Sequence, residues 1–286
     1  MSPDRQARGP VHLIFQEDLL RGMDPALDVL LAGHVPHVFS SSDDWKTRLE
    51  ALNRELGPVT PLEPETGARV AVFCSLQVAA HIRRHCDHLR QGILQDEDRL
   101  AIHVFTGLIP RDWLLNRDVI LLPFGQVEAR AAQLETLFGP RLFMRPDSSK
   151  KTFSGCVFDI SDIGHEVSAQ RQIHNIHGDE LVAIDRARDI APFEYRFWLA
   201  EGRVITHAAY ALERIEDAPP CPPTVARLAE EVARHVEYTL PMVVADFVLD
   251  EGGQPRLVEV NGFSTAGFYP GTDFHALVTA LDGLIY

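Results

Sequence analysis

Apolar and polar residues alternate along two stretches of the chain, Val243–Leu249 and Arg256–Asn261, which flank the glycine pair at 252–253. Alternation with a period of two is the pattern of a β-strand with one buried face. Two glycines between such stretches favour a two-residue hairpin turn. The sequence therefore predicts a β-hairpin in the last part of the chain.

The register of this hairpin decides which side chains share a face. A two-residue turn at the glycine pair places Asp246 opposite Glu259 and Phe247 opposite Val258. Asn261, two residues beyond Glu259, then lies on the same face as the two acids. Phe247 and Val258 are expected on the other face of the hairpin.

Two carboxylates that lie directly opposite each other repel, so this pair is unfavourable without a cation between its members. Asp246, Glu259 and Asn261 carry the oxygen ligands that Mg²⁺ prefers, usually together with the phosphates of a nucleotide. The hairpin therefore predicts a metal site borne on strands. An ordinary hairpin with a solvated acidic face is the alternative, and the pattern alone does not decide between the two.

Further upstream, short apolar stretches alternate with segments of helical spacing, of which Trp45–Leu56 and Leu76–Leu89 are the clearest. Strands alternating with helices are typical of an α/β architecture. Strands are expected at Val11–Phe15, His37–Ser40, Arg69–Cys74, Leu100–Phe105, Val119–Leu122, Leu142–Arg145, Cys156–Ile160 and Glu180–Asp185.

Composition narrows the class of protein. The chain has 286 residues, which is long enough for two domains, and a formal net charge of −14. That charge argues against nucleic acid or an anionic membrane as partner, because both favour a basic surface. The four cysteines are far apart, and neither a signal peptide nor a run of about 20 apolar residues is visible. We therefore expect a cytoplasmic protein with reduced thiols.

A polar loop follows the strand that ends near Arg145. It contains Lys150, Lys151, Ser154 and Gly155. Loops of serine, glycine and lysine can bind phosphate through backbone N–H groups and ammonium charge. The P-loop motif is absent, and an ordinary surface loop between two strands is the alternative interpretation.

A second alternating stretch, Phe193–Leu199, is followed by a turn at residues 201–202 and predicts another hairpin. Glu194 and Arg196 share one face of its first strand. An arginine there could bind an anionic substrate group. A surface ion pair between Arg196 and Glu194 is the competing interpretation.

The order of these motifs resembles that of the ATP-grasp superfamily, whose metal-binding hairpin carries a D…E-x-N pattern, here Asp246 and Glu259-Val260-Asn261. Arg145 stands where many members have a lysine before the phosphate loop. The chain is thus similar to a branch in which arginine replaces this lysine and a loop lysine, here Lys151, supports it. Arginine keeps the charge and can bind phosphate oxygens in bidentate fashion.

The resemblance implies ATP and Mg²⁺ as cofactors, with Mn²⁺ as an alternative metal. Adenine would bind backbone groups of Val182 and Ala183, and Asp185 would hold the ribose. The phosphates would meet Arg145, Lys150, Lys151, Ser154 and Gly155. Arg196 would lie near the transferred phosphate or a substrate carboxylate, and the acceptor site would be lined by Ser264, Thr265 and Gly267.

The function implied by the resemblance is an ATP-dependent carboxylate–amine ligase that forms an acylphosphate and releases ADP, with Arg145, Lys151 and Arg196 as catalytic residues. Its substrates would be small-molecule or peptide carboxylates and amines. A small-molecule kinase on the same scaffold and a nucleotide-binding module without turnover are the alternatives. The oligomeric state stays open, a homodimer included.

The expected fold class is α/β with an α+β grasp. Residues 1–125 are expected to form an N-terminal α/β domain. Residues 126–286 are expected to form a two-lobed ATP-grasp domain that contains the nucleotide and magnesium site.

Overall fold

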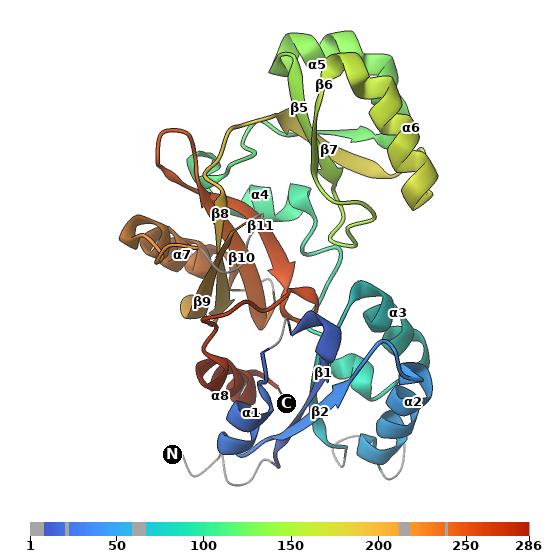
Figure 1. Cartoon of the computed structure of the whole chain (residues 1–286), viewed down its shortest axis with the longest axis vertical. Helices are drawn as coiled ribbons and strands as arrows, with labels where there is room; N and C mark the ends of the chain where they lie inside the picture. Colours follow the sequence, from blue (N-terminus) through green and yellow to red (C-terminus); the bar gives the residue numbers. More distant parts are fainter. Residues whose placement is uncertain (1–8, 21–22, 59–66, 212–217, 238–239, 286) are drawn as a thin grey trace.

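The computed structural model describes residues 9–20, 23–58, 67–211, 218–237 and 240–285. Three β-sheets follow one another along the long axis of the molecule (Figure 1). We call them the first sheet (β2-β1-β3), the second sheet (β4-β7-β5-β6) and the third sheet (β11-β10-β8-β9). The third sheet lies between the other two, so its two ends can contribute to two different interfaces.

The first sheet is parallel and belongs to the predicted N-terminal α/β domain. The elements of this domain are β1 (Val11–Gln16), α1 (Ala26–Leu31), β2 (Val35–Phe39), α2 (Trp45–Leu56), β3 (Arg69–Phe73) and α3 (Leu76–His85). Two helices, α2 and α3, pack on one face of the sheet. Asp44 caps the N-terminus of α2, and Ser75 caps that of α3, each by accepting a hydrogen bond from a backbone N–H group.

The segment that follows differs from its prediction. Leu100–Phe105 was expected as a strand, but the structure has helix α4 (Ile102–Leu108) there. Ile102 and Phe105 of α4, and Ile109 directly after it, are buried in the same apolar cluster as helix α7 (Pro223–Val236). A short apolar stretch fits a strand or a buried helix equally well, and here packing decides for the helix.

The second sheet is antiparallel. Its strands are β4 (Ile120–Pro123), β5 (Arg141–Pro146), β6 (Cys156–Asp159) and β7 (Leu181–Arg186), and helices α5 (Ala131–Phe138) and α6 (Ile163–His174) pack on it. Because β4 pairs with β7, this lobe begins before residue 126, the expected start of the second domain.

The third sheet consists of two hairpins, β8 (Phe193–Ala200) with β9 (Arg203–Ala211), and β10 (Met242–Leu249) with β11 (Pro255–Gly262). Helix α7 covers one face. Asp246 pairs with Glu259 as expected, but a β-bulge after Asp246 pairs Phe247 with Leu257. The prediction for Val258 was therefore wrong: it is the extra residue of the bulge and lines the same cavity as Glu259.

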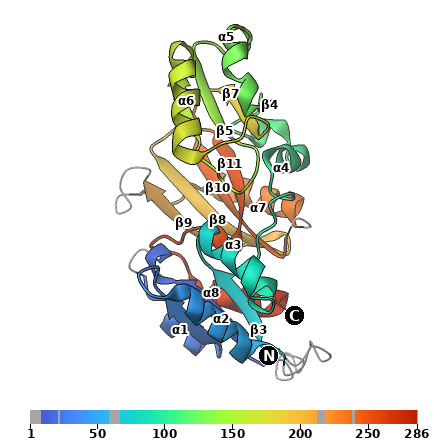
Figure 2. The ribbon, with the colours of Figure 1, turned by 90° about the vertical axis from the view of Figure 1, so that its right-hand side faces the viewer.

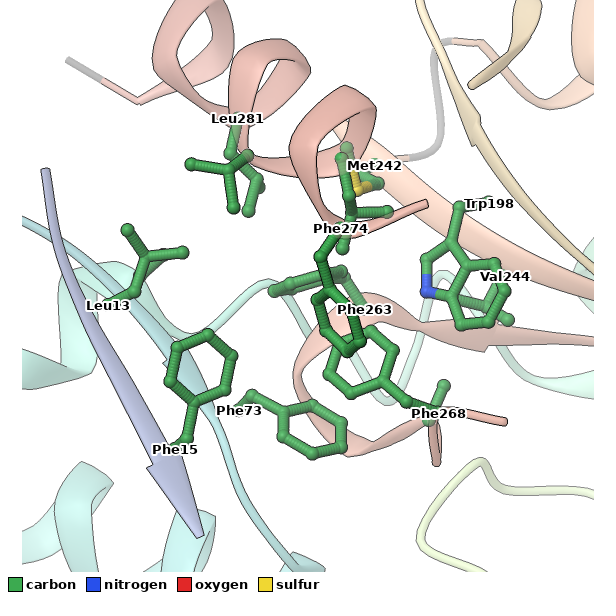
Figure 3. Packing of buried hydrophobic residues seen from close by; sticks show 14 of the residues in the cluster. Leu13, Phe15, Phe73, Trp198, Met242, Val244, Phe263, Phe268, Phe274 and Leu281 are labelled. Carbon is green, nitrogen blue, oxygen red and sulfur yellow. The ribbon is translucent and has the colours of Figure 1, made fainter. Parts of the chain in front are cut away.

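The last helix, α8 (Phe274–Leu284), returns to the N-terminal domain and packs beside α1 (Figure 2). One apolar cluster joins the two parts of the chain there (Figure 3). It combines Phe15 and Phe73 of the first sheet with Trp198 of the third sheet and Phe268. The C-terminal residues thus fix the first sheet against the third.

The fold is a mixed α+β structure with an N-terminal α/β domain, as the sequence predicts. Among the residues that the structure describes, none of the helices has the length and apolar character needed to cross a membrane.

Candidate functional site

A cavity of about 240 Å³ lies where the second and third sheets approach each other. Strand β5 and the loop after it form one wall, and the middle of β11 with the start of β8 forms the other. Charged and small residues line it: Arg145, Lys151, Ser154, Gly155, Glu194 and Glu259. Five of these six were predicted as site residues, and Glu194 was not.

Glu259, on β11 of the third sheet, forms ion pairs with two cations of the lobe built on the second sheet. One carboxylate oxygen lies 2.7 Å from Nη2 of Arg145, and the other lies 2.8 Å from Nζ of Lys151. The Asn261 amide also donates to Glu259, over 2.8 Å. Burial alone would raise the pKa of this carboxyl, but the two cations and the amide hold it well below its usual range. Glu259 is thus a half-buried, ionised acceptor that still faces the cavity.

Asp246 is fully buried and paired with Arg196, which lies opposite it on the adjacent strand β8. Two parallel hydrogen bonds of 2.7 Å join the guanidinium to the carboxylate. Burial raises the pKa of Asp246, and Arg196 opposes this shift by favouring the ionised form. The surface pair between Arg196 and Glu194, which was the competing interpretation of the sequence, is not found, and Arg196 forms a buried pair with Asp246 instead.

The three predicted metal ligands share one face of the third sheet. Asp246 and Glu259 are paired across β10 and β11, and Nδ2 of Asn261 donates to both, over 3.2 Å to Asp246 and 2.8 Å to Glu259. The repulsion expected between the two acids is offset by three cations, Arg145, Lys151 and Arg196. The negative charge on this face of the sheet is therefore neutralised by cationic side chains of the protein.

These side chains fit a Mg²⁺ ion in chemistry, because two carboxylates and an amide offer hard oxygen donors on one surface. Each carboxylate has about four lone-pair positions, so Asp246 can keep Arg196 and still bind a metal. In the described part of the chain, no cluster of three or more histidine, cysteine, aspartate or glutamate residues forms another metal site.

Glu194 and two tyrosines are functional candidates that the sequence did not single out. Glu194 lines the cavity and accepts a hydrogen bond from the Tyr210 hydroxyl. Tyr210 stacks on Tyr269 at 3.8 Å between ring centroids, and Arg196 lies over both rings. Burial, with the Asp246 carboxylate nearby, raises the pKa of Glu194 to about 7. Alternation placed Glu194 beside Arg196, but nothing in the sequence marked Tyr210 or Tyr269.

The two neighbouring lysines of the polar loop point to different partners. Lys151, which has a positive φ of 49°, reaches Glu259 in the cavity. Lys150 instead lies 3.1 Å from Glu97, outside the cavity. Gly155 packs directly on the Phe143 ring, where an added Cβ would lie 2.9 Å from two ring carbons. Of the predicted loop residues, only Lys150 is not brought to this site.

A smaller apolar cavity adjoins the first and shares Phe143, Arg145 and Val258 with it. Its volume is about 10 Å³, which is the space of about one water molecule. Ala183 and Leu257 line it from the second and third sheets. An aromatic ring could enter only if the two lobes separated or these side chains moved.

The groups predicted to bind adenine and ribose already have partners within the protein. Val182 and Ala183 lie on β7 between β4 and β5, so their backbone groups belong to the sheet on both sides. Asp185 is fully buried and accepts hydrogen bonds from the backbone of Asp118 and from Arg188. The end of β7 is thus closed by residues that the sequence does not place nearby.

The loop after β11 lies close to Arg196, but its polar groups are already bonded. The Gly267 carbonyl accepts from Nη1 of Arg196 over 2.8 Å. Ser264 is fully buried, and its hydroxyl accepts from the backbone N–H of Leu94. The Thr265 hydroxyl donates to Gln95. The structure gives these residues structural partners rather than free groups that face a substrate.

The sheet order, and a charged cavity between two antiparallel lobes, define an ATP-grasp protein. The family model described as an ATP-grasp domain, family 3 of the R-2-K clade, matches residues 110–281, more than half of the chain. The chain belongs to this family, and the resemblance inferred from the sequence is confirmed. No curated protein matches the chain by sequence.

Solved structures share the fold over nearly the whole chain. D-cycloserine synthetase DcsG has a TM-score of 0.60 at 11% identity, with 96% of this chain and 99% of that chain covered. N5-carboxyaminoimidazole synthetase from Staphylococcus aureus, complexed with ADP, has a TM-score of 0.60 at 14% identity, covering 96% and 77%. The ligase PsnB, complexed with precursor peptide PsnA2 and AMPPNP, has a TM-score of 0.57 at 13% identity, covering 96% and 97%. Identities this low establish the fold and not the substrate.

Proposed function

We propose that the protein is an ATP-dependent carboxylate–amine ligase that forms an acylphosphate and releases ADP. The observation that carries this proposal is the convergence of Arg145, Lys151 and Arg196 on the opposed acids Asp246 and Glu259. Cations and hard oxygen donors on facing lobes are what a metal–triphosphate needs. The ATP-grasp family supplies the frame in which this chemistry is expected.

The triphosphate would bind in the charged cavity. Its oxygens would compete with Glu259 for Arg145 and Lys151, since both cations already point there. The backbone around Ser154 and Gly155, at the same wall, would add N–H donors. The adenine would enter the small apolar cavity between Phe143 and Leu257, which must first open.

Asp246, Glu259 and Asn261 would hold Mg²⁺ or Mn²⁺. When bound, the metal neutralises phosphate oxygens and orients the transferred group. Glu259 becomes available for this role when phosphates take over its two cations. Arg196 keeps Asp246 ionised and fixed, so the site does not depend on the metal for its geometry.

In the proposed reaction an oxygen of the substrate carboxylate attacks the γ-phosphorus, and the bond to the β-phosphate oxygen breaks. ADP leaves, and an acylphosphate forms. An amine then attacks the acyl carbon, and inorganic phosphate departs as the amide forms. Lys151 and Arg145 would offset the charge that develops on the phosphoryl group, with Arg196 close to the acyl end. Glu194, whose pKa is about 7, lines the cavity and would accept the proton of the amine.

The substrates are proposed only as classes, a carboxylate and an amine that are small molecules or parts of a peptide. The PsnB structure contains a precursor peptide, and D-cycloserine synthetase is named for a small product. A kinase on the same scaffold would share the nucleotide site and would release ADP without consuming an amine. A binding module would hold ATP without releasing ADP.

Product analysis tests this proposal. The protein is incubated with ATP, Mg²⁺ and a mixed pool of amino acids and short peptides, and the nucleotides are separated. We expect ADP that forms only when the pool is present, and none with the Asp246→Asn variant. AMP as the product would contradict the mechanism, and ADP with a stable phosphorylated product would establish the kinase.

A further inference from the structure

Gln95 joins two loops that belong to opposite sides of the proposed site. It lies in the segment between α3 and α4 and is buried, with 7% of its surface exposed. Its amide Nε2 donates to the Ser149 hydroxyl over 3.0 Å, and its Oε1 accepts from the Thr265 hydroxyl over 2.9 Å. Ser149 belongs to the polar loop that carries Lys151, and Thr265 to the loop that follows Asn261.

The position of Gln95 is fixed on the side of β11. The backbone N–H of Leu94 donates to the Ser264 hydroxyl over 2.8 Å, and the Ser264 N–H donates to the Leu94 carbonyl over 3.4 Å. At Gly262, directly after Asn261, an added Cβ would lie 2.0 Å from Oε1 of Gln95 and 2.7 Å from the Leu94 carbonyl oxygen. Only glycine at residue 262 lets this segment cross the strand so closely.

On the other side, the start of α4 and the segment before it hold the polar loop at further points. Asp147 accepts from the His103 ring over 2.7 Å, and its carbonyl accepts from the Ile102 N–H over 2.9 Å. Glu97 lies 3.1 Å from Nζ of Lys150. These contacts explain why Lys150 turns away from the cavity while its neighbour Lys151 enters it.

We propose that Gln95 is a positioning residue that couples the loop containing Ser149 and Lys151 to the loop containing Thr265. A change in the position of one loop then changes the position of the other, because Ser149 and Thr265 are both hydrogen-bonded to the side-chain amide of Gln95. This inference rests on the proposed function in one respect: it predicts that nucleotide affinity depends on Thr265. The coupling itself concerns the free protein and can be measured without any substrate.

The test compares Ser149→Ala, Thr265→Val and the double variant, each in the wild-type and the Gln95→Leu background. The first readout is the rate of tryptic cleavage after Lys150 and Lys151, followed by mass spectrometry. Ser149→Ala, which removes one hydrogen bond of the cleaved loop, should speed cleavage about three-fold. Thr265→Val should have a similar effect, although Thr265 does not contact the loop that is cleaved. In the Gln95→Leu background, neither change should add to the rate.

Gln170→Leu is the matched control, because Gln170 is a partly buried glutamine on α6 of the same lobe and bonds to Glu166. It should leave cleavage after Lys150 and Lys151 unchanged. Effects of Ser149→Ala and Thr265→Val that are additive and persist in the Gln95→Leu background would overturn the proposal. Should Gln95→Leu not fold, non-additivity between the two single changes in the wild-type background decides the question.

The second readout is the Kd for AMP-PNP with Mg²⁺, measured by calorimetry on the same variants. Thr265→Val should weaken binding about three-fold with Gln95 present and have no effect in Gln95→Leu. A wild-type protein that does not bind AMP-PNP would refute the proposed function, while the cleavage result would still decide the coupling. Binding that is weakened equally in both backgrounds would contradict the coupling alone.

Discussion

Lys151 and Glu259 lie 108 residues apart in the sequence and are joined by an ion pair of 2.8 Å between Nζ and Oε1. This contact spans the two lobes, because Lys151 belongs to the loop after β5 and Glu259 to β11. The loop lysine is therefore directed into the cavity by a carboxylate of the protein itself. On binding, a phosphate of the nucleotide would replace Glu259 as the anionic partner of Lys151.

This geometry separates the two neighbouring lysines in a binding experiment. Lys151→Ala should weaken ATP binding about ten-fold, since one charge-assisted hydrogen bond is lost. Lys150→Ala is the matched control and should weaken binding by no more than about three-fold, because its ammonium group bonds to Glu97 outside the cavity and acts only through the position of the loop. Calorimetric titration with ATP and Mg²⁺ measures both. Equal losses for the two variants would contradict the assignment of Lys151.

Removing the charge of Asp246 should affect both stability and activity. Asp246→Asn leaves Arg196 buried without its carboxylate, which should lower the free energy of unfolding by about 3 kcal/mol. Asp43→Asn breaks an exposed pair with Arg48 and should cost less than about 1 kcal/mol. Urea denaturation compares the two. Similar losses would mean that the Arg196 pair does not contribute as a buried pair.

Glu194 gives the stability a pH dependence of predictable sign. Its pKa is about 7 in the folded protein and near 4.5 when unfolded, so the folded state holds the proton more tightly. Stability from this group is therefore present below pH 4.5 and is lost as the pH rises to about 7. Glu194→Gln should match the wild type at pH 4.5 and be more stable by about 1–3 kcal/mol at pH 8.

Denaturation curves at several pH values check this prediction. Glu135→Gln, on the exposed side of α5, is the control and should leave the difference from the wild type constant with pH. A Glu194→Gln variant that loses stability relative to the wild type as the pH rises would reverse the assigned sign.

Ser264 separates a structural role from substrate binding. Ser264→Ala removes the acceptor of the partly buried Leu94 N–H and should lower the free energy of unfolding by about 1–2 kcal/mol. The affinity for AMP-PNP with Mg²⁺ should fall by no more than the about three-fold expected for Thr265→Val, because the Ser264 hydroxyl does not line the cavity and acts only through the segment that carries Gln95. A higher KM for the carboxylate at unchanged stability would instead support the contact inferred from the sequence.

Much of the fold follows from local pattern. The C-terminal hairpin, the pairing of Asp246 with Glu259 and the position of most strands were predictable, because alternation and turn residues act over short distances. The bulge at Val258 was not predictable, because the alternation of apolar and polar residues in this strand does not show where an extra residue is inserted into the pairing. Helix α4 was missed because burial on a helix and on a strand gives similar short apolar stretches.

The site depends on longer-range pairing, which the sequence does not encode in a visible pattern. Arg196 lies beside Asp246 because β8 pairs with β10, although β9 and α7 separate the two strands in the chain. Whether Lys150 or Lys151 enters the cavity depends on Glu97, and the role of Gln95 depends on the crossing at Gly262. Each of these contacts is set by tertiary packing.

Trapping with hydroxylamine tests the central claim most directly. The protein is incubated with ATP, Mg²⁺, the pool of amino acids and short peptides, and a large excess of hydroxylamine, which competes with the amines of the pool. The proposed acylphosphate predicts a hydroxamate, which identifies the carboxylate by mass, and the hydroxamate and amide together should equal the ADP. ADP released with the pool present, but with neither a hydroxamate nor a new amide, would contradict an acylphosphate and with it the ligase mechanism.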